Sequence, residues 1–276
     1  MLSINGTRIR RDPGKPVMED STMLKRILVF GYGVTCYAIF FATFLYAIGF
    51  VGNLFVPRAI DGIPAVPLWQ ALLVNLGLLG LFAVQHSVMA RPVFKRWITR
   101  YIPKAAERST YVLISSLALI VLFANWEPMG GVIWQVTDPV GQALLYGGFA
   151  FGWGLVLLAT FLINHFDLFG LRQAWLYLIG RPYTALAFKT PALYRVVRHP
   201  LYVGWLFAFW ATPVMTVAHL VFAVMTTAYI LIAIRLEERD LMDAHPEYAG
   251  YRRRVPMLVP RLRKSRNPGN PAAETV

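Results

Sequence analysis

Four long apolar stretches constrain the fold of this chain more than any other feature of its sequence. They span Ile27–Phe50, Leu68–Ala90, Ser109–Trp126 and Val140–Asn164. A helix needs about 20 mainly apolar residues to cross a bilayer, and each stretch is close to that length. Charged residues make up only 15% of the 276 residues, whereas soluble domains carry about 25%. The sequence therefore predicts an all-α, polytopic transmembrane helical bundle.

A fifth apolar region runs from Leu201 to Ile234 and is too long for one crossing but short for two. The segment Ala211-Thr212-Pro213 interrupts it near the middle, because proline lacks the N–H that the interior of a helix requires. We expect this region to form a tight helical hairpin, which brings the bundle to five to six crossings.

Basic residues are distributed unevenly between the connections. Of the 27 Lys and Arg residues, 26 lie in the N-terminal segment, the second and fourth connections, and the C-terminal tail. Arg58 alone lies in the remaining connections. Because Lys and Arg mark the cytoplasmic side of membrane proteins, we expect the long basic connections and both termini to face the cytoplasm, with the chain in a bacterial inner membrane.

The formal net charge of +13 raises the question whether the chain binds nucleic acid. A nucleic-acid site interleaves basic residues with stacking aromatics on a soluble face, whereas the basic residues here form blocks between apolar segments. These blocks suit the anionic headgroups of membrane lipid instead. The histidines show no paired spacing of metal ligands, so the sequence predicts no metal site.

The domain organisation follows from the same pattern. We expect a cytoplasmic segment over residues 1–26, one membrane domain over 27–260 and a disordered tail over 261–276. No Gly-x-Gly-x-x-Gly motif follows a strand, so a Rossmann-type cofactor domain is not expected.

The most specific motif is Arg-His-Pro-x-Tyr-x-Gly over residues 198–204. Proline is favoured in the first turn of a helix, so we expect the first helix of the hairpin to begin at Pro200. The free N–H groups of that turn, beside Arg198 and His199, would form an anion site, and Gly204 would leave room for a ligand. The alternative is that Arg198 extends to lipid phosphate while His199 only caps the helix.

Two adjacent carboxylates, Glu237 and Glu238, follow at the other end of the hairpin. Hairpin geometry would bring them beside Arg198, so that the arginine binds the carboxylate of a zwitterion and the glutamates bind its ammonium. Adjacent carboxylates at a membrane boundary are costly unless they are paired. The alternative is a solvated helix end that Arg235 and Arg239 neutralise.

Two tyrosines, Tyr248 and Tyr251, lie three residues apart and would share one face of a helix. They would either roof a cofactor pocket or lie at the membrane interface, where aromatic residues are common.

These features together resemble the isoprenylcysteine carboxyl methyltransferase superfamily of membrane methyltransferases. The resemblance covers about residues 194–260 and implies that this unit binds S-adenosylmethionine from the cytoplasmic side. The cofactor residues that it implies, with their neighbours in the two motifs, are Arg198, His199, Leu201, Tyr202, Gly204, Glu237, Glu238 and Tyr251.

The N-terminal part is similar to one branch of that superfamily, through residues 85–92, 107–111 and 164–173. This branch contains the bacterial methanethiol S-methyltransferases and NnrU-type proteins. The resemblance implies methylation of methanethiol, or another small thiol, to give dimethyl sulfide. The alternatives are a prenylcysteine or phospholipid methyltransferase, a non-catalytic NnrU-type protein of nitrogen-oxide metabolism, and a membrane reductase that uses a nicotinamide cofactor.

Such a reaction needs a thiolate, and a thiol has a pKa of about 8.5 that burial raises. Either a general base or a nearby cation is therefore required. We expect His165, oriented by Asp167, to take the proton, with His86 as the competing candidate and Arg172 holding the thiolate. The alternative is a polar cluster that ties helices together.

Overall fold

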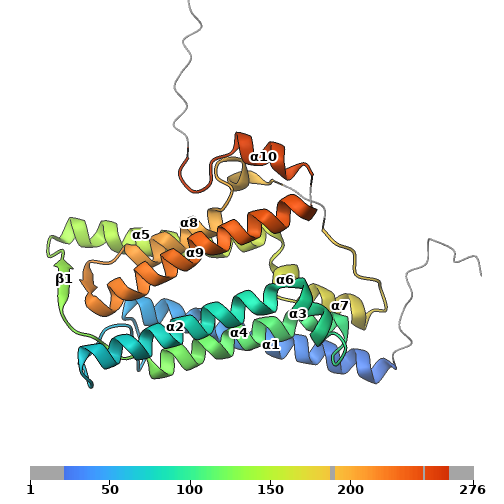
Figure 1. Cartoon of the computed structure of the whole chain (residues 1–276), viewed down its shortest axis with the longest axis horizontal. Coiled ribbons are helices and arrows are strands. Elements are labelled where there is room, and N and C mark those ends of the chain that lie inside the picture. Colours follow the sequence, from blue (N-terminus) through green and yellow to red (C-terminus); the bar gives the residue numbers. More distant parts are fainter. Residues whose placement is uncertain (1–21, 187–189, 245, 261–276) are drawn as a thin grey trace, which may run out of the picture.

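The computed structural model describes residues 22–186, 190–244 and 246–260 (Figure 1). The predicted tail 261–276, and all but the end of the predicted segment 1–26, lie outside the described residues. The elements are α1 (Met23–Gly52), α2 (Leu68–Ala90), α3 (Pro92–Ile98), α4 (Lys104–Asn125), β1 (Val132–Gln135), α5 (Pro139–Ile163), α6 (His165–Leu168), α7 (Leu171–Leu178), the 3-10 turn η1 (Ala192–Arg195), α8 (Pro200–Trp210), β2 (Val214–Thr216), α9 (Val217–Ala244) and α10 (Tyr248–Arg254).

Among the described residues, five helices are long and apolar enough to cross a membrane, namely α1, α2, α4, α5 and α9. They run along the long axis of the molecule (Figure 1). The chain is therefore an integral membrane protein with five candidate spans, and the four apolar stretches predicted as crossings are all helical. The fifth apolar region divides into α8 and α9, and α8 ends at Trp210, directly before the predicted break. With 11 residues, α8 is only about 16 Å long.

The α8 helix packs closely against α5 at two glycines. A Cβ atom on Gly204 would lie 2.8 Å from both the carbonyl oxygen of Gly152 and the backbone nitrogen of Val156. The prediction that Gly204 leaves room for a ligand is therefore wrong. Its missing side chain lets two helix backbones approach each other, as small residues do at helix contacts in membranes.

Two short strands depart from the all-α prediction. β1 and β2 pair antiparallel and join the α4–α5 connection to the α8–α9 connection. We call this end of the bundle, with residues 53–67, 126–138 and 211–216, the strand end. The opposite end, with residues 91–103, 164–186, 190–199 and 246–260, is the basic end.

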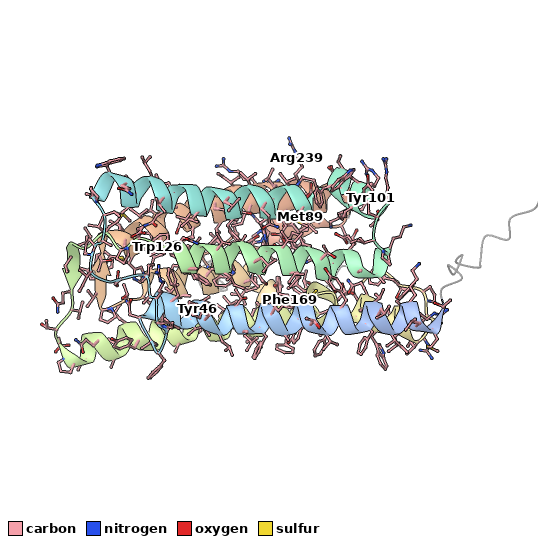
Figure 2. The ribbon with its side chains drawn as sticks, turned by 90° about the horizontal axis from the view of Figure 1, so that it is seen from below. Tyr46, Met89, Tyr101, Trp126, Phe169 and Arg239 are labelled. Carbon is pink, nitrogen blue, oxygen red and sulfur yellow. The ribbon has the colours of Figure 1, made fainter. Side chains whose placement is uncertain are left out.

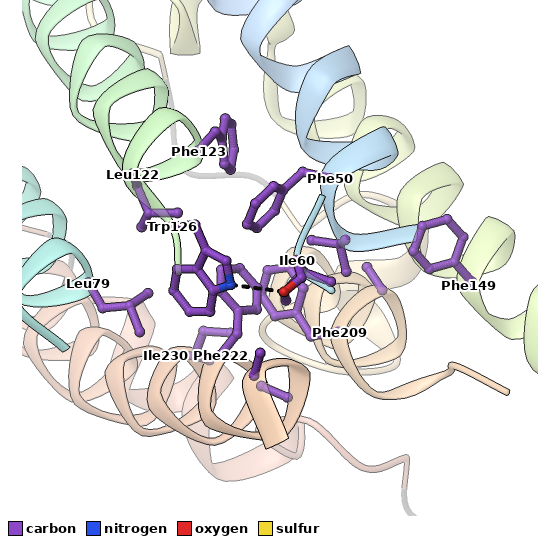
Figure 3. Packing of buried hydrophobic residues seen from close by; sticks show 14 of the residues in the cluster. Phe50, Ile60, Leu79, Leu122, Phe123, Trp126, Phe149, Phe209, Phe222 and Ile230 are labelled. Atoms are coloured by element: carbon purple, nitrogen blue, oxygen red, sulfur yellow. Dashed lines mark hydrogen bonds between the residues drawn. The ribbon is translucent and has the colours of Figure 1, made fainter. Parts of the chain in front are cut away.

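Most residues of the main hydrophobic core lie toward the strand end, and Figure 3 shows how its side chains pack between the helices. Phe50, Trp126 and Phe222 stack edge to face in it, with ring centroids 5.8 to 6.2 Å apart. The indole Nε1 of Trp126 donates a 3.0 Å hydrogen bond to the carbonyl of Ile60, which anchors the 53–67 connection. Packed aromatic rings thus fill this half of the bundle.

The basic end is assembled by short helices that dock on the long ones. Arg108 on α4 donates a 2.7 Å hydrogen bond from Nε to the carbonyl of Leu168 in α6. Gly170 has a φ of +89° and lies against Ser109, where a side chain would collide with α4. Phe169 and Met89 lie inside the bundle between the helices (Figure 2), in one cluster with Tyr111. The α6–α7 segment therefore rests on the start of α4.

Candidate active site

Residues 198–204 and 237–238 meet at the basic end, as the sequence predicts. The Oε1 atom of Glu238 on α9 accepts hydrogen bonds from Arg198 Nε at 2.7 Å and lies 3.0 Å from His199 Nε2. Its Oε2 atom lies 3.0 Å from the Nε of Arg252, at the end of α10. One buried carboxylate thus joins α8, α9 and α10.

Backbone hydrogen bonds also hold this corner, the region around Glu238 where α8, α9 and α10 meet. The N–H groups of Arg198 and His199 donate to the carbonyls of Pro256 and Met257. The Nη1 of Arg198 also donates to the carbonyls of Arg252 and Val255, at 2.9 and 2.7 Å. Arg198 therefore turns inward, and the alternative that it extends to lipid phosphate is wrong. His199 precedes α8 but makes no side-chain cap bond, so the capping alternative is wrong as well.

The two adjacent glutamates have different surroundings. The side chain of Glu238 is 6% exposed, and that of Glu237 is 47% exposed. Glu237 Oε2 accepts a 3.0 Å hydrogen bond from the hydroxyl of Tyr202 and lies 4.0 Å from His199 Nδ1. A carboxylate offers about four acceptor positions, so Glu237 keeps acceptor capacity for a ligand. Glu238 is not open to a ligand, because its side chain is almost fully buried and three internal donors already lie against its two oxygens.

Arg235 and Arg239 do not neutralise the glutamates. Both are exposed, and within the described part of the chain the ion-pair partners of Glu238 are Arg198, His199 and Arg252 instead. The alternative of a simply solvated helix end is therefore wrong for Glu238.

Tyr248 and Tyr251 are buried on α10, with ring centroids 5.5 Å apart. The hydroxyl of Tyr251 donates a 2.6 Å hydrogen bond to the carbonyl of Tyr194, and burial raises the pKa of Tyr251 to about 12. Both rings therefore hold α10 against the molecule, and their burial excludes a place among exposed interfacial aromatics. Leu201, in the first turn of α8, is half-buried.

His165 is 3% exposed, and both of its ring nitrogens are engaged. Nε2 lies 2.8 Å from the hydroxyl of Tyr37, and Nδ1 lies 2.8 Å from that of Thr160. Phe161 stacks on the ring at 4.2 Å. The prediction that Asp167 orients His165 is therefore wrong.

Asp167 instead pairs with Arg172, with Oδ1 2.7 Å from Nη1. The side chain of Asn164 accepts a hydrogen bond from the N–H of Asp167 and caps this turn. Arg172 also donates to the carbonyl of Thr184, and its guanidinium lies over the ring of Tyr183 at 5.2 Å. Arg172 thus ties α7 to the connection that follows it.

His86 forms a second histidine–tyrosine pair. Its Nε2 lies 2.7 Å from the hydroxyl of Tyr111, and its Nδ1 lies 3.2 Å from the hydroxyl of Ser115. The guanidinium of Arg108 lies 5.0 Å over the ring of Tyr111. Sequence reasoning missed Tyr37 and Tyr111 as partners of the two histidines, because the contacts join different helices.

The α2 helix also contacts α9, which carries the glutamates. The hydroxyls of Ser87 and Tyr229 lie 3.1 Å apart. Near the basic end, Arg91 Nη1 pairs with Asp240 Oδ2 at 3.2 Å. His86, next to Ser87, is therefore on the helix that lies along α9. Over the residues that the structure describes, no three His, Cys, Asp or Glu side chains gather as metal ligands.

Comparison with known proteins identifies the family to which the chain belongs. A methanethiol S-methyltransferase from Crocosphaera subtropica is 58% identical over 245 residues, covering 88% of this chain and 96% of the relative. A methanethiol S-methyltransferase from Mycobacterium tuberculosis is 54% identical, covering 86% and 98%. Nurim from Bos taurus is 32% identical, covering 78% and 86%.

No family model matches the chain, and no solved structure is significantly similar to it. The identity to the curated relatives covers most of both chains rather than one motif. On that similarity, this membrane protein belongs to the methanethiol S-methyltransferase family.

Proposed function

We propose that this chain transfers the methyl group of S-adenosylmethionine to the sulfur of methanethiol, giving dimethyl sulfide and S-adenosylhomocysteine. The substrate and reaction come from the relatives that are 54 and 58% identical over most of the chain. The observation that supports the site is the half-exposed carboxylate of Glu237, bonded to Tyr202 beside the Arg198–Glu238 pair.

The residues of this corner fit the cofactor. S-Adenosylmethionine carries an ammonium, a carboxylate and ribose hydroxyls, and when bound it supplies an electrophilic methyl group on a positively charged sulfur. Glu237 has acceptor capacity for the ammonium or the hydroxyls. No side chain caps the first turn of α8, so the N–H groups of Leu201 and Tyr202, before the first bond from Val203 to His199, keep the partial positive charge that favours a carboxylate.

The other predicted cofactor residues have supporting roles in this proposal. Glu238 fixes Arg198 and His199, and so sets the angle at which α8 begins. Tyr251 holds α10 over the same corner through Tyr194. These contacts position Tyr202 and Glu237, which are the groups with room for a ligand.

We propose that His86 takes the thiol proton. It lies on α2, which contacts α9 at Tyr229, two helical turns from Glu237. The S–H bond breaks, the proton goes to the His86–Tyr111 pair, and the electron pair stays on sulfur. A positioned base contributes about 10²- to 10⁴-fold in rate.

His165 is the second candidate for this role. Both histidines have their two ring nitrogens against hydroxyl groups. His165 ranks second because it is 3% exposed and enclosed by Phe161 and Phe169, at 4.2 and 4.8 Å, whereas His86 is half-buried. Asp167 and Arg172 bond to each other rather than to His165. A role for Arg172 in holding the thiolate requires that pair to open.

The orientation is part of the proposal. We place the basic end in the cytoplasm, with both termini there and α8–α9 as a hairpin that enters and leaves on that side. Of the 27 Lys and Arg residues, 26 support this orientation, because basic connections remain cytoplasmic. Residues 27–260 act as one domain, and 194–260 is the unit that holds the cofactor.

Substrate choice is tested with the purified protein. Release of S-adenosylhomocysteine is measured with methanethiol, with longer alkyl thiols, with a prenylcysteine and with phospholipid. The proposal predicts release with methanethiol and a decline as the alkyl chain lengthens. Release with the prenylcysteine or phospholipid alone would contradict it, and so would the absence of release with every acceptor.

A further inference from the structure

An apolar groove follows α8 where this helix packs against α5. Its larger hollow has a volume of about 380 Å³ and is lined by Val196 near the start of α8 and by Phe151 on α5. A second hollow of about 280 Å³ continues along α8 to Phe207 and shares Val203 and Pro260 with the first. All the residues that line the two hollows are apolar. We call the two hollows together the α8 groove.

The α8 groove faces the hydrocarbon layer of the membrane. One of its walls, α5, is a candidate span, and on that wall Phe151 and Leu158 are 54% and 50% exposed. With 11 residues, α8 is about half as long as the hydrocarbon layer is thick. Because α8 begins at the basic end, the groove lies within the leaflet on that side.

The lining determines what can fill this groove. Water needs two to four polar partners to occupy a buried site, which apolar side chains do not provide. A void would cost the lining atoms their dispersion contacts. Gly154 lines the groove, and a Cβ atom built on it would meet no atom within 4 Å. The space beside Gly154 is therefore open to an acyl chain from the surrounding leaflet.

The mouth of the groove at the basic end carries an arginine. Arg195 ends η1, and Leu193 and Val196 on either side of it line the groove. Arg195 is exposed, and in the described part of the chain its Nε donates to the carbonyl of Thr190 at 3.2 Å rather than to a carboxylate. The rest of its guanidinium is therefore available to a phosphate, which arginine binds through paired N–H groups.

We propose that the α8 groove binds one anionic phospholipid, with an acyl chain along α8 from Val196 to Phe207 and the phosphate at Arg195. The positive charge of the basic end complements such a headgroup. The groove is separate from the candidate active site, since neither Glu237 nor His86 lines it. The inference therefore does not depend on the proposed reaction. The bound lipid would support the short helix that carries Tyr202.

The headgroup is tested by native mass spectrometry of the full chain in neutral detergent, which counts the phospholipids that each chain retains. The wild type should retain one dioleoyl phosphatidylglycerol and bind it more tightly than dioleoyl phosphatidylcholine, whose headgroup has no net charge. Arg195→Gln should lower this preference about fivefold, the contribution of one arginine near an anionic headgroup.

The acyl-chain position is tested by filling the groove. Gly154→Leu should reduce retention of both lipids on the order of tenfold, as expected when extra methylenes are forced into a filled space. Gly147→Leu is the matched control. Gly147 lies about two turns away on the same face of α5, meets no atom within 4 Å and does not line the groove. It should leave retention unchanged.

Circular dichroism establishes that each variant is folded. Equal retention of phosphatidylglycerol by folded Gly154→Leu and Gly147→Leu would overturn the site, and so would a wild-type chain that retains no phospholipid. An unchanged headgroup preference in Arg195→Gln would overturn the place of the phosphate. Displacement of the phosphatidylglycerol by an equal amount of a prenylcysteine would assign the groove to the tail of a lipid substrate instead, and would also overturn the proposal.

Discussion

The carboxylate of Glu238 on α9 lies 2.7 Å from the guanidinium of Arg198, just before α8 begins. This pair is almost fully buried, whereas the neighbouring carboxylate of Glu237 is half-exposed. We therefore propose separable roles for the two adjacent glutamates: Glu238 holds Arg198 and His199 in place, and Glu237 contacts the ligand.

Glu238→Gln is expected to destabilise the protein, because it leaves the buried Arg198 without its counter-ion. Removing one member of a buried pair costs about 3 to 5 kcal/mol. Glu237→Gln should instead keep the unfolding midpoint and weaken binding of S-adenosylmethionine about tenfold, in line with loss of one charged hydrogen bond. Thermal unfolding in detergent and calorimetry measure the two effects. If the two variants had equal unfolding midpoints, or equal affinities for S-adenosylmethionine, the separate roles of Glu237 and Glu238 would be contradicted.

His86→Ala is expected to lower turnover with methanethiol about 10²- to 10⁴-fold while cofactor binding persists. The physical reason is loss of the group that accepts the thiol proton. Turnover should recover partly as the pH rises, because thiolate then forms without a base. Ser115→Ala is the control, since it removes the hydroxyl at the other nitrogen of His86 and leaves the imidazole in place. Wild-type turnover in His86→Ala, with loss in His165→Ala, would move the base to His165.

His165 lies just beyond α5, and burial lowers its pKa below the ordinary value. Below about pH 6.5 His165 is protonated in the unfolded chain but stays neutral in the folded chain. The contribution of His165 to the free energy of unfolding is therefore fully present above about pH 6.5 and falls as the pH decreases below that value. His165→Gln should flatten this dependence, although losing the contacts to Tyr37 and Thr160 lowers stability at neutral pH. Unfolding midpoints between pH 5 and 8 measure the slope. A slope equal to that of the wild type would show that another group is responsible.

Gly204→Ala is expected to disrupt the α5–α8 contact, because the new methyl would collide with the backbone of Gly152 and Val156. The cost should be about 1 to 3 kcal/mol, as for other overpacked positions. Gly154→Ala, in the same region of α5, meets no atom within 4 Å and should be neutral or slightly stabilising. Unfolding midpoints compare the two variants. Similar stability in both would mean that α8 does not depend on close contact with α5.

Helix positions could be predicted from sequence because the length of an apolar run is a local property. The runs at 68–90 and 140–164 match α2 and α5 to within a residue, and the break before Pro213 coincides with the end of α8. The meeting of residues 198–204 with 237–238 could also be predicted, since α8 and α9 are consecutive. Each of these features depends on residues that are close in sequence or on helices that follow one another along the chain.

Contacts between distant helices could not be predicted in this way. The partners of His165 and His86 are Tyr37 and Tyr111, from helices whose rotation the sequence does not specify. Gly204 was expected to admit a ligand because its motif suggested one, whereas the approach of α5 determines its surroundings. The β1–β2 pairing joins two connections too short to give a periodic signal.

Transfer of a labelled methyl group tests the central claim most directly. Purified protein is given methanethiol and S-adenosylmethionine that carries a trideuterated methyl group, and the headspace is analysed by gas chromatography with mass detection. We expect dimethyl sulfide in which one methyl group is fully deuterated, with formation reduced in Glu237→Gln at low donor concentration. Dimethyl sulfide without the label, or label found only in lipid, would contradict it.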